Sequence, residues 1–428
     1  MKILWLCSQP INIIAEQLKL PKVILGGWLE GIALNLARQE GIEFFYLFPN
    51  SNHDKQSIHL LQKIHFIDFG IKGLNRAMYR SKFNLLISND EFDVIHVFGT
   101  ENKVLNDLIQ ECDVRKVVTS LQGIMSEVYK NNLNSIFRYH RFKNGFKQML
   151  AQSLLMLNQR QLFQRAYFEK KVLTKIVNVI GRTEWDKACI ERLNPNVKYF
   201  TNNEILREEF YNSKKWEVNS KEKYRIFVSQ GSYPLKGLHF ILKAMAELKH
   251  DYPEIELIIA GEDITKNQAL SAKIGISYSN FIQHIIYKEE LEKNVHFTGA
   301  LTASQMNDEL IKCHVFVIAS TIENSPNALG EAMILGVPSI CSKVGGITSM
   351  ITDGFDGLLF ESGDALALAN KIRNIFDDDV LSKALSKNAI KSAEMRFDRE
   401  ENIKSLIKIY QSVCTSFGSK GQPGSISE

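Results

Sequence analysis

The feature that most constrains this chain is a series of continuous apolar runs of strand length, separated by longer stretches with helical spacing. Runs rich in Val, Ile, Leu and Phe are typical of strands buried on both faces of a parallel sheet. They read "KILWLC", "EFFYLFP", "IHFIDF", "DVIHVFG", "KVVTSLQ", "VNVIGRT" and "VKYFTN" in the first half, and "RIFVSQ", "ELIIAGE", "VHFTGA", "VFVIAS", "PSICS" and "GLLFE" in the second. The alternation of such runs with helices predicts an α/β fold.

The length of 428 residues exceeds the usual size of one core, so we expect two doubly wound domains. The segment from Phe210 to Tyr224 is polar and weakly periodic, which suggests a linker there. We therefore predict domains at 1–209 and 210–390, a helix at 391–416 that packs back on the first domain, and a disordered tail at 417–428. The returning helix would use one apolar face, formed by Ile403, Leu406, Ile407 and Tyr410.

Composition excludes several classes of protein. The hydrophobic content of 45% and charged content of 23% are ordinary for a globular protein, and a net charge of +4 is too small to indicate nucleic acid. The six cysteines are scattered without metal-ligand spacing, which fits a reducing cytoplasm and gives no sign of a metal site. The opening "MKILWLCSQP" turns polar too soon for a signal peptide, and no apolar run is long enough to span a membrane.

Ligands of open parallel sheets bind beyond the carboxyl ends of the strands, so the loops that follow strands are the candidate sites. Gly26 and Gly27 begin a helical pattern, where a backbone without side chains can approach an anion. Lys236 follows the strand "RIFVSQ" and stands where a helix starts. Taken alone, the glycines are equally well explained as turn residues, and the lysine as a solvated charge.

The third loop, "ENSPNALGEAM", places two carboxylates eight positions apart after the strand "VFVIAS". Glu331 is expected at a helix start, where it could accept hydrogen bonds from a vicinal diol while the amides around Leu329 and Gly330 face a phosphate. This chemistry fits a ribose diphosphate. Glu323 would then meet the group attached to the diphosphate. The alternative is a capping carboxylate at Glu331 and a solvated Glu323.

These residues resemble the retaining glycosyltransferases of the GT-B fold, particularly the family-four group, also called glycosyltransferase group 1, and its bacterial surface-polysaccharide branch. The resemblance is carried by the E-x7-E pair Glu323 and Glu331, by "LGEAMILGVPSI" and by "VGGITSMITDGFDGLLF". The stretches "SYPLKGLHFILKA", "GRTEWDKA" and "NEILREEFY" are similar to segments of that branch. The resemblance covers both halves and is most specific in the second.

The resemblance implies transfer of a sugar from a nucleotide-diphosphate sugar, with a UDP- or GDP-sugar as donor, to a saccharide acceptor with retention at the anomeric carbon and without a metal or other cofactor. It also implies two Rossmann-like domains that face a cleft, the first binding the acceptor and the second the donor. Glu323 and Lys236 would be catalytic. The implied donor-binding residues are Gly26, Gly27, Lys236, Asn327, Ala328, Leu329, Gly330 and Glu331.

Two positions depart from the family's pattern. Many members carry an arginine where this chain has Gly231, and many carry a histidine where it has Gln122. This chain therefore lacks, at position 231, the second cation of those members. At position 122 it lacks the histidine through which they contact the donor sugar. His96, which follows another apolar run, is a further candidate for the cleft, although a lone histidine in such a run is more often structural.

The segment from residue 131 to 175 is strongly basic and interleaved with aromatic residues. Its nine lysines and arginines against one glutamate give +8, so the remainder of the chain carries −4, that is +4 minus +8. Basic amphipathic helices of this kind can lie on an anionic membrane. We therefore expect a cytoplasmic protein that associates peripherally with the inner face of the plasma membrane, near a lipid-linked acceptor of capsule, exopolysaccharide or O-antigen type synthesis; the alternative is a solvated helix face.

Two other functions are compatible with the sequence. The same fold hosts nucleotide-sugar epimerases, which need no acceptor. A catalytically silent member that only binds a partner is also compatible with Gln122 and Gly231. Release of nucleoside diphosphate that depends on an added acceptor would separate these functions from glycosyl transfer.

Overall fold

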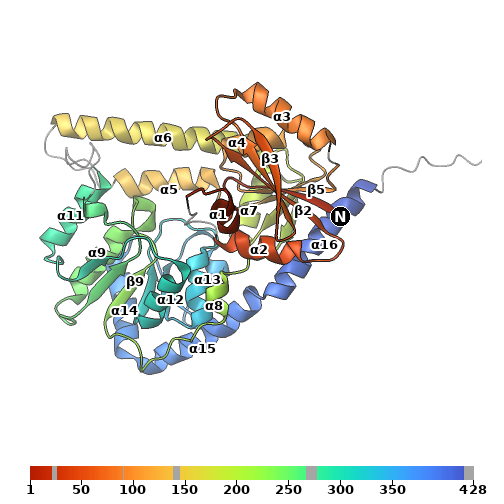
Figure 1. Cartoon of the computed structure of the whole chain (residues 1–428). Helices are drawn as coiled ribbons and strands as arrows, with labels where there is room; N and C mark the ends of the chain where they lie inside the picture. Colours follow the sequence, from red (N-terminus) through yellow and green to blue (C-terminus); the bar gives the residue numbers. More distant parts are fainter. Residues whose placement is uncertain (22–26, 90, 138–144, 267–276, 419–428) are drawn as a thin grey trace, which may run out of the picture. The chain divides into compact units, whose positions relative to one another are not determined.

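Two separate sheets organise the chain in the computed structural model (Figure 1). The structure describes residues 1–21, 27–89, 91–137, 145–266 and 277–418. The chain divides into two compact units, of which the first comprises Met1–Ile124, Arg165–Ile205 and Asp398–Glu428, and the second Met125–Gln164 and Leu206–Phe397. Residues 125–164, which the sequence places in the first domain, thus group with the second unit.

The first unit contains an eight-stranded sheet in the order β3-β4-β2-β1-β5-β6-β7-β8. Its strands are β1 (Lys2–Leu6), β2 (Glu43–Asn50), β3 (Gln56–Leu61), β4 (Ile64–Gly70), β5 (Val94–Phe98), β6 (Val117–Ser120), β7 (Asn178–Gly181) and β8 (Lys198–Thr201). All neighbours pair in parallel except β3 and β4. Each of the seven apolar runs expected in the first half forms one of the parallel strands.

Strand β3 was not expected from the sequence. Its residues alternate between exposed and half-buried, because it lies at the edge of the sheet and pairs with β4 alone, in the antiparallel direction. Such a strand lacks the continuous apolar run of a strand covered on both faces.

The second unit contains a six-stranded sheet, every pair of which is parallel, in the order β11-β10-β9-β12-β13-β14. Its strands are β9 (Arg225–Val228), β10 (Glu256–Ile259), β11 (Val295–Phe297), β12 (Val315–Ile318), β13 (Ser339–Ser342) and β14 (Leu358–Phe360). All six match the expected runs. The two doubly wound sheets confirm the α/β fold class.

The helices of the first unit are α1 (Asn12–Gln17), α2 (Gly27–Ala37), α3 (Arg76–Asn89), α4 (Lys103–Ile109), α7 (Glu184–Leu193) and α16 (Arg399–Gly418). Those of the second are α5 (Met125–Phe137), α8 (Glu208–Tyr211), η1 (Pro234–Lys236), α9 (Leu238–Leu248), η2 (Ile264–Lys266), α11 (Tyr278–Lys288), α12 (Ala303–Lys312), α13 (Asn327–Leu335), η3 (Gly345–Ser349), α14 (Ala365–Asp377) and α15 (Asp379–Arg396). The division between the units falls within α6 (Gly145–Leu173).

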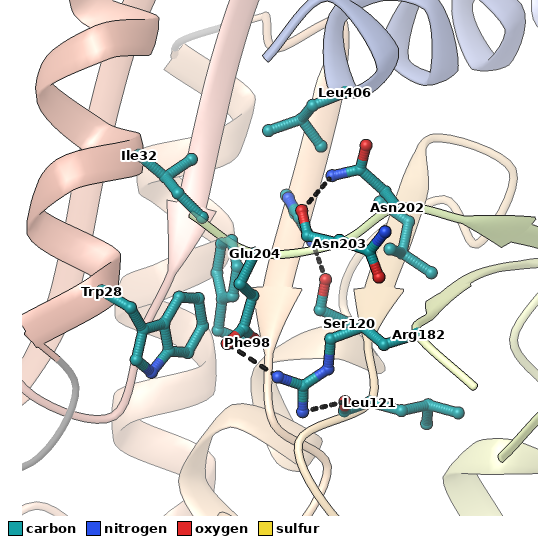
Figure 2. A pocket seen from close by; sticks show the side chains of 12 residues that line it. Trp28, Ile32, Phe98, Ser120, Leu121, Arg182, Asn202, Asn203, Glu204 and Leu406 are labelled. Carbon is teal, nitrogen blue, oxygen red and sulfur yellow. Dashed lines mark hydrogen bonds and ion pairs between the residues drawn. The ribbon is translucent and has the colours of Figure 1, made fainter. Parts of the chain in front are cut away.

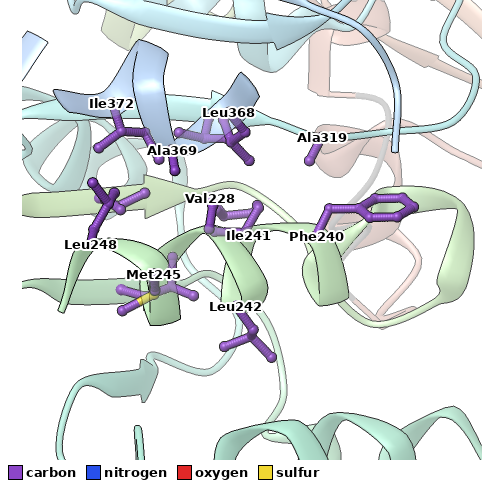
Figure 3. Packing of buried hydrophobic residues seen from close by; sticks show 14 of the residues in the cluster. Val228, Phe240, Ile241, Leu242, Met245, Leu248, Ala319, Leu368, Ala369 and Ile372 are labelled. Atoms are coloured by element: carbon purple, nitrogen blue, oxygen red, sulfur yellow. The ribbon is translucent and has the colours of Figure 1, made fainter. Parts of the chain in front are cut away.

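Helices cover the second sheet with a continuous apolar core. Val228 of β9 belongs to a buried cluster with Ile241 and Met245 of α9 and with Leu368 and Ile372 of α14 (Figure 3). All five side chains are almost completely shielded from solvent. Burial of a side chain of this size contributes roughly 1.5–3 kcal/mol, so the cluster fixes α9 and α14 on the sheet and with them the loops at the strand ends.

The segment expected to be a linker is instead packed into the second unit. Phe210 is completely buried in α8, and Trp216 is buried with its indole N–H donating to the carbonyl of Cys313 at 2.8 Å. These two aromatic anchors, together with hydrogen bonds such as that from the Trp216 amide to the Leu335 carbonyl at 2.7 Å, hold a segment of polar composition against the second unit.

The helix expected at 391–416 is divided in the structure. α15 ends at Arg396, Phe397 is buried, and the Asp398 carboxylate accepts a hydrogen bond from the Glu401 amide at 2.8 Å where α16 begins. A carboxylate at this position is a typical helix N-cap. In the first unit α16 lies beside α2, and Leu406 and Tyr410 are buried in the core that also contains Trp5 (Figure 1).

Candidate functional site

The loops after β9 and β12 meet at one edge of the second sheet, because these strands are parallel neighbours. η1 follows β9 and ends at Lys236, whereas the loop after β12 carries Glu323. The Lys236 Nζ lies 2.6 Å from Glu323 Oε1, and the Ser320 hydroxyl donates to the same oxygen at 2.7 Å. The structure therefore joins, in one ion pair, two residues for which separate roles were expected, Lys236 for the phosphate and Glu323 for the sugar.

The environment of this pair keeps the lysine charged. The side chains of Lys236 and Glu323 are 21% and 13% exposed. Burial by itself lowers the pKa of the Lys236 ammonium, but the charge of Glu323 and the hydrogen bonds of Glu323 and Tyr233 outweigh it, so the pKa is raised. Because an ammonium has three donors, Lys236 can bind an anionic ligand without releasing Glu323.

Gly237 brings η1 against the end of β12. Its φ of +70° lies in the left-handed region, and a Cβ at this position would stand 1.9 Å from the carbonyl oxygen of Ala319. The Thr321 amide also donates to the Leu235 carbonyl at 2.8 Å. Only glycine permits this approach of two backbones, which places Lys236 within reach of Glu323.

A third strand end supports Glu323 from its other side. The carbonyl oxygen of Glu323 accepts a hydrogen bond from the Gly346 amide at 3.0 Å, in the η3 turn after β13. Gly345 has a φ of +50°, and a Cβ there would lie 2.0 Å from the same oxygen. The loops after β9, β12 and β13 thus converge on one residue, Glu323: Lys236 and Ser320 contact its carboxylate, and the turn after β13 contacts its backbone carbonyl.

Glu331 lies farther along α13 than the sequence suggested. The N-cap is Pro326 and the helix begins at Asn327, which places Glu331 in the second turn and not at the helix start. The amides of Leu329 and Gly330, expected to face a phosphate, both donate to the carbonyl of Pro326. Proline suits the position just before the helix, because it has no amide hydrogen to donate to a preceding turn and its backbone is extended here, with ψ of 118°.

The Glu331 carboxylate is buried and held by Arg207. The guanidinium donates from Nε to Oε1 at 2.7 Å and from Nη2 to Oε2 at 2.8 Å. Burial raises the pKa of Glu331, and Arg207 opposes this shift. Arg207 belongs to the stretch "NEILREEFY" and was not assigned a role from the sequence; its only signal was a basic residue inside a segment that carries the family resemblance.

Gly330 has a packing role. A Cβ there would meet the ring of Phe397 at 2.5 Å and a methyl group of Leu206 at 3.1 Å. The residue therefore allows α13 to pack closely within its own unit, which accounts for a glycine inside a helix without reference to a ligand.

Two further candidate residues are Gly26 and Gly27. Gly26 lies outside the described residues. Gly27 is the first residue of α2 and is partly exposed. Trp28, the next residue, lines a small pocket in the first unit.

This pocket is polar on one side and apolar on the other (Figure 2). Its cavity volume is about 20 Å³, enough for one water molecule or one ligand hydroxyl group. The lining residues are Trp28, Ile32, His96, Phe98, Ser120, Leu121, Ile180, Arg182, Asn202, Asn203, Glu204 and Leu406. The side-chain oxygens of Asn202 and Asn203 are buried without a hydrogen-bond donor among the described residues.

A buried ion pair forms the base of the polar side. Arg182 Nη1 lies 2.7 Å from Glu204 Oε2, and both side chains are less than 10% exposed. Gln122 Nε2 donates to Glu204 Oε1 at 3.0 Å. The glutamine that replaces the family's histidine therefore orients this carboxylate, and its amide is engaged within the protein.

His96 forms part of a buried hydrogen-bond chain. The indole N–H of Trp5 donates to the Tyr410 hydroxyl at 2.9 Å, which lies 2.6 Å from His96 Nδ1, and His96 Nε2 lies 2.8 Å from Ser120 Oγ. Burial lowers the pKa of His96 to about 3, so the ring is neutral.

A structural role accounts for this histidine. The indole N–H of Trp5 can only donate, so the Tyr410 hydroxyl accepts from Trp5, and both ring nitrogens of His96 continue the chain between Tyr410 and Ser120. His96 thus links Tyr410 of α16 to Ser120 of β6.

The basic segment is described only in part. Arg138, Arg141 and Lys143 lie outside the described residues. On the described part of α6, the exposed large apolar side chains are Leu157, Phe163, Tyr167 and Phe168, and the exposed basic residues are Arg160, Arg165, Lys170 and Lys171. The one acid of the segment, Glu169, is buried and accepts a hydrogen bond from Thr100 at 2.6 Å. All exposed charged side chains on the described part of α6 are therefore positive.

Residues 209–392 match the family model described as Glycosyl transferases group 1. The chain is 29% identical over 211 residues to the putative glycosyltransferase YtcC of Bacillus subtilis, covering 47% of this chain and 48% of that protein. It is 31% identical over 127 residues to the putative teichuronic acid biosynthesis glycosyltransferase TuaC of the same organism, covering 29% and 32% respectively. The chain thus aligns with half or less of the length of these two relatives.

Solved structures share the fold over nearly the whole chain. Sucrose-phosphate synthase from Thermosynechococcus elongatus has a TM-score of 0.71 at 17% identity, with 97% of this chain and 100% of that chain covered. Anabaena Alr3699/HepE in complex with UDP-glucose has a TM-score of 0.65 at 17% identity, covering 98% and 100%. The chain therefore has the GT-B fold, and the match of residues 209–392 to Glycosyl transferases group 1 agrees with the resemblance expected for the second half.

Within the described part of the chain, no helix is long and apolar enough to cross a bilayer. Among the same residues, no group of three or more His, Cys, Asp or Glu side chains is arranged to hold a metal ion.

Proposed function

We propose that this protein is a glycosyltransferase that moves a sugar from a nucleoside-diphosphate donor to a saccharide acceptor, with retention at the anomeric carbon. The observation that carries the proposal is the convergence of Lys236 and Glu323 at the strand ends of the region that matches Glycosyl transferases group 1. A cation for the leaving diphosphate and a carboxylate for the sugar stand there side by side.

Each group has a chemical task in this proposal. The bond between the anomeric carbon and the diphosphate oxygen breaks, a new bond to the acceptor oxygen forms, and the proton of the acceptor hydroxyl passes to the departing diphosphate. Lys236 stabilises the negative charge that develops on the departing diphosphate, as preorganised donors do in transition states. Glu323 binds the sugar, and Glu331 accepts hydrogen bonds from the ribose diol. Lys236 takes the place of a divalent metal in this scheme.

Related proteins support the donor and acceptor classes. Alr3699/HepE was solved with UDP-glucose, and TuaC is named for teichuronic acid biosynthesis. A Campylobacter jejuni relative, 30% identical over 119 residues, is named as acting on a diphospho-undecaprenol. We propose by analogy a UDP- or GDP-sugar donor and a lipid-linked saccharide acceptor in capsule, exopolysaccharide or O-antigen type synthesis.

Release of nucleoside diphosphate provides the first test. We expect purified protein to release UDP or GDP from one sugar nucleotide only when a saccharide or lipid-linked acceptor is added, and EDTA to leave the rate unchanged. Release without acceptor, or isomerisation of the donor sugar, would indicate an epimerase. Binding without turnover would indicate a silent member. Activity lost with EDTA and restored by Mg²⁺ would refute the metal-independent mechanism.

We also propose that α6 attaches the protein to an anionic membrane surface. Tyr167 and Phe168 are 48% and 45% exposed and lie beside Lys170 and Lys171 on the helix. Aromatic rings of this kind settle at the headgroup level, and each nearby lysine contributes about 1 kcal/mol on an anionic surface.

Sedimentation with anionic liposomes measures this attachment. We expect the protein to pellet with anionic vesicles, to be released as salt shortens the Debye length from about 10 Å at 0.1 M to about 3 Å at 1 M, and to remain in solution with neutral vesicles. Changing Tyr167, Phe168, Lys170 and Lys171 to Ser should weaken pelleting, whereas changing the exposed Lys63 and Lys72 to Ser should not. Equal recovery in the supernatant with and without anionic lipid would refute the proposal.

A further inference from the structure

The bidentate pair of Arg207 and Glu331 has a consequence for the donor site. Two parallel N–H donors fix both the position and the plane of a carboxylate, which a single contact does not do. The guanidinium is itself fixed, since it lies 4.9 Å from the centre of the Phe210 ring and Phe210 is completely buried. Arg207 therefore presents a rigid fork to Glu331.

Arg207 leaves part of the carboxylate available. An ionised carboxylate offers about four lone-pair sites, and the two hydrogen bonds from Arg207 use two of them. A vicinal diol needs two acceptor positions, one on each oxygen. The two remaining lone-pair sites, on a side chain that is 5% exposed, are the ones that we expect a diol to use while Arg207 stays in place.

We propose that Arg207 is a positioning residue for the nucleotide: it holds Glu331 ionised and oriented for the ribose diol of the donor. The inference rests on the proposed function, since it assumes that Glu331 binds ribose.

The electrostatics of the described residues agree with this role. Burial raises the pKa of Glu331, the Arg207 fork and its charge lower it, and the nearby carboxylate of Glu209 raises it. Removal of Arg207 leaves burial and Glu209 unopposed. The carboxyl group then becomes protonated at higher pH, and a neutral carboxyl group accepts a diol less well.

The test is the pH dependence of UDP and GDP affinity, measured by calorimetry at about pH 6, 7 and 8. We expect the affinity of the parent protein to be nearly constant. Arg207→Met should bind about ten- to a hundredfold more weakly at the lowest pH and recover as pH rises, because Glu331 ionises. Arg207→Lys keeps the cation and loses the fork, so it should bind with intermediate affinity and little pH dependence.

Thermal unfolding distinguishes this role from a purely structural one. A carboxyl group with a raised pKa in the folded state contributes stability that is lost as pH rises above its ordinary value of 4.5. Arg207→Met should therefore unfold at lower temperature as pH rises, while its nucleotide affinity increases. If the substitution only damaged the fold, the unfolding temperature and the nucleotide affinity would rise or fall together as pH changes.

Arg225→Met is the matched control. Arg225 forms an ion pair with Glu309 at 2.5 Å, but it lies at the start of β9, away from the strand ends that carry the site. Its loss should lower stability and leave nucleotide affinity at the parent's value at every pH. If Arg207→Met binds nucleotide with the parent's pH profile while Glu331→Ala loses affinity, the positioning role is refuted and the proposed function stands. If the parent binds neither nucleotide, both are refuted.

Discussion

Lys236→Ala should lower the rate of sugar transfer by about a hundredfold or more, because it removes the cation to which we assign stabilisation of the departing diphosphate. The effect should appear mainly in kcat, with a smaller change in donor affinity, since the charge on the diphosphate increases as the bond breaks. The measurement is the steady-state rate of acceptor-dependent nucleoside diphosphate release.

Two comparisons separate this effect from loss of structure. Lys236→Ala leaves the Glu323 carboxylate without its cation, so the unfolding temperature is measured in parallel. Glu323→Gln should also reduce turnover more than nucleoside diphosphate binding, because the ligand group that we propose for it is the sugar. Lys249→Ala, which removes a lysine from the far end of α9, should behave like the parent protein. Parent-like turnover in Lys236→Ala would show that the catalytic site lies elsewhere.

Gly237→Ala should destabilise the second unit by about 3 kcal/mol or more, since it combines a left-handed backbone with a collision against another backbone. The added methyl group would stand 1.9 Å from the Ala319 carbonyl oxygen, which cannot rotate away as a side chain could. This collision would push the loop after β9 away from the loop after β12, and Lys236 would then move away from Glu323. We therefore expect loss of turnover together with a lower midpoint of denaturant unfolding.

Gly354→Ala provides the control for backbone strain alone. Gly354 has a φ of +76°, close to the +70° of Gly237, but a Cβ there would meet nothing within 4 Å. Its replacement should lower stability by about 1–2 kcal/mol and leave turnover unchanged. Equal destabilisation by the two substitutions would mean that the approach to Ala319 is not what requires glycine at position 237.

The positions of the parallel strands could be predicted from the sequence because burial on both faces requires a continuous apolar run, which is a local property. All thirteen predicted runs form strands, whereas β3 escaped because an exposed antiparallel edge has no such requirement. The loops that carry the candidate site could be predicted for the same reason, since ligands of parallel sheets bind beyond the strand ends.

The partners of the charged residues were decided by the tertiary structure. Lys236 and Glu323 are 87 positions apart, and Arg207 and Glu331 are 124 apart. No local pattern relates such positions; they meet because the order of strands brings β9 beside β12 and because the buried Phe210 and Trp216 anchor the segment after Arg207. The sequence alone therefore determined which lysine and which glutamates were candidates for binding a nucleotide sugar. Which carboxylate each cation holds was determined only by the packing of strands and helices, because an ion pair depends on distance in space and not along the chain.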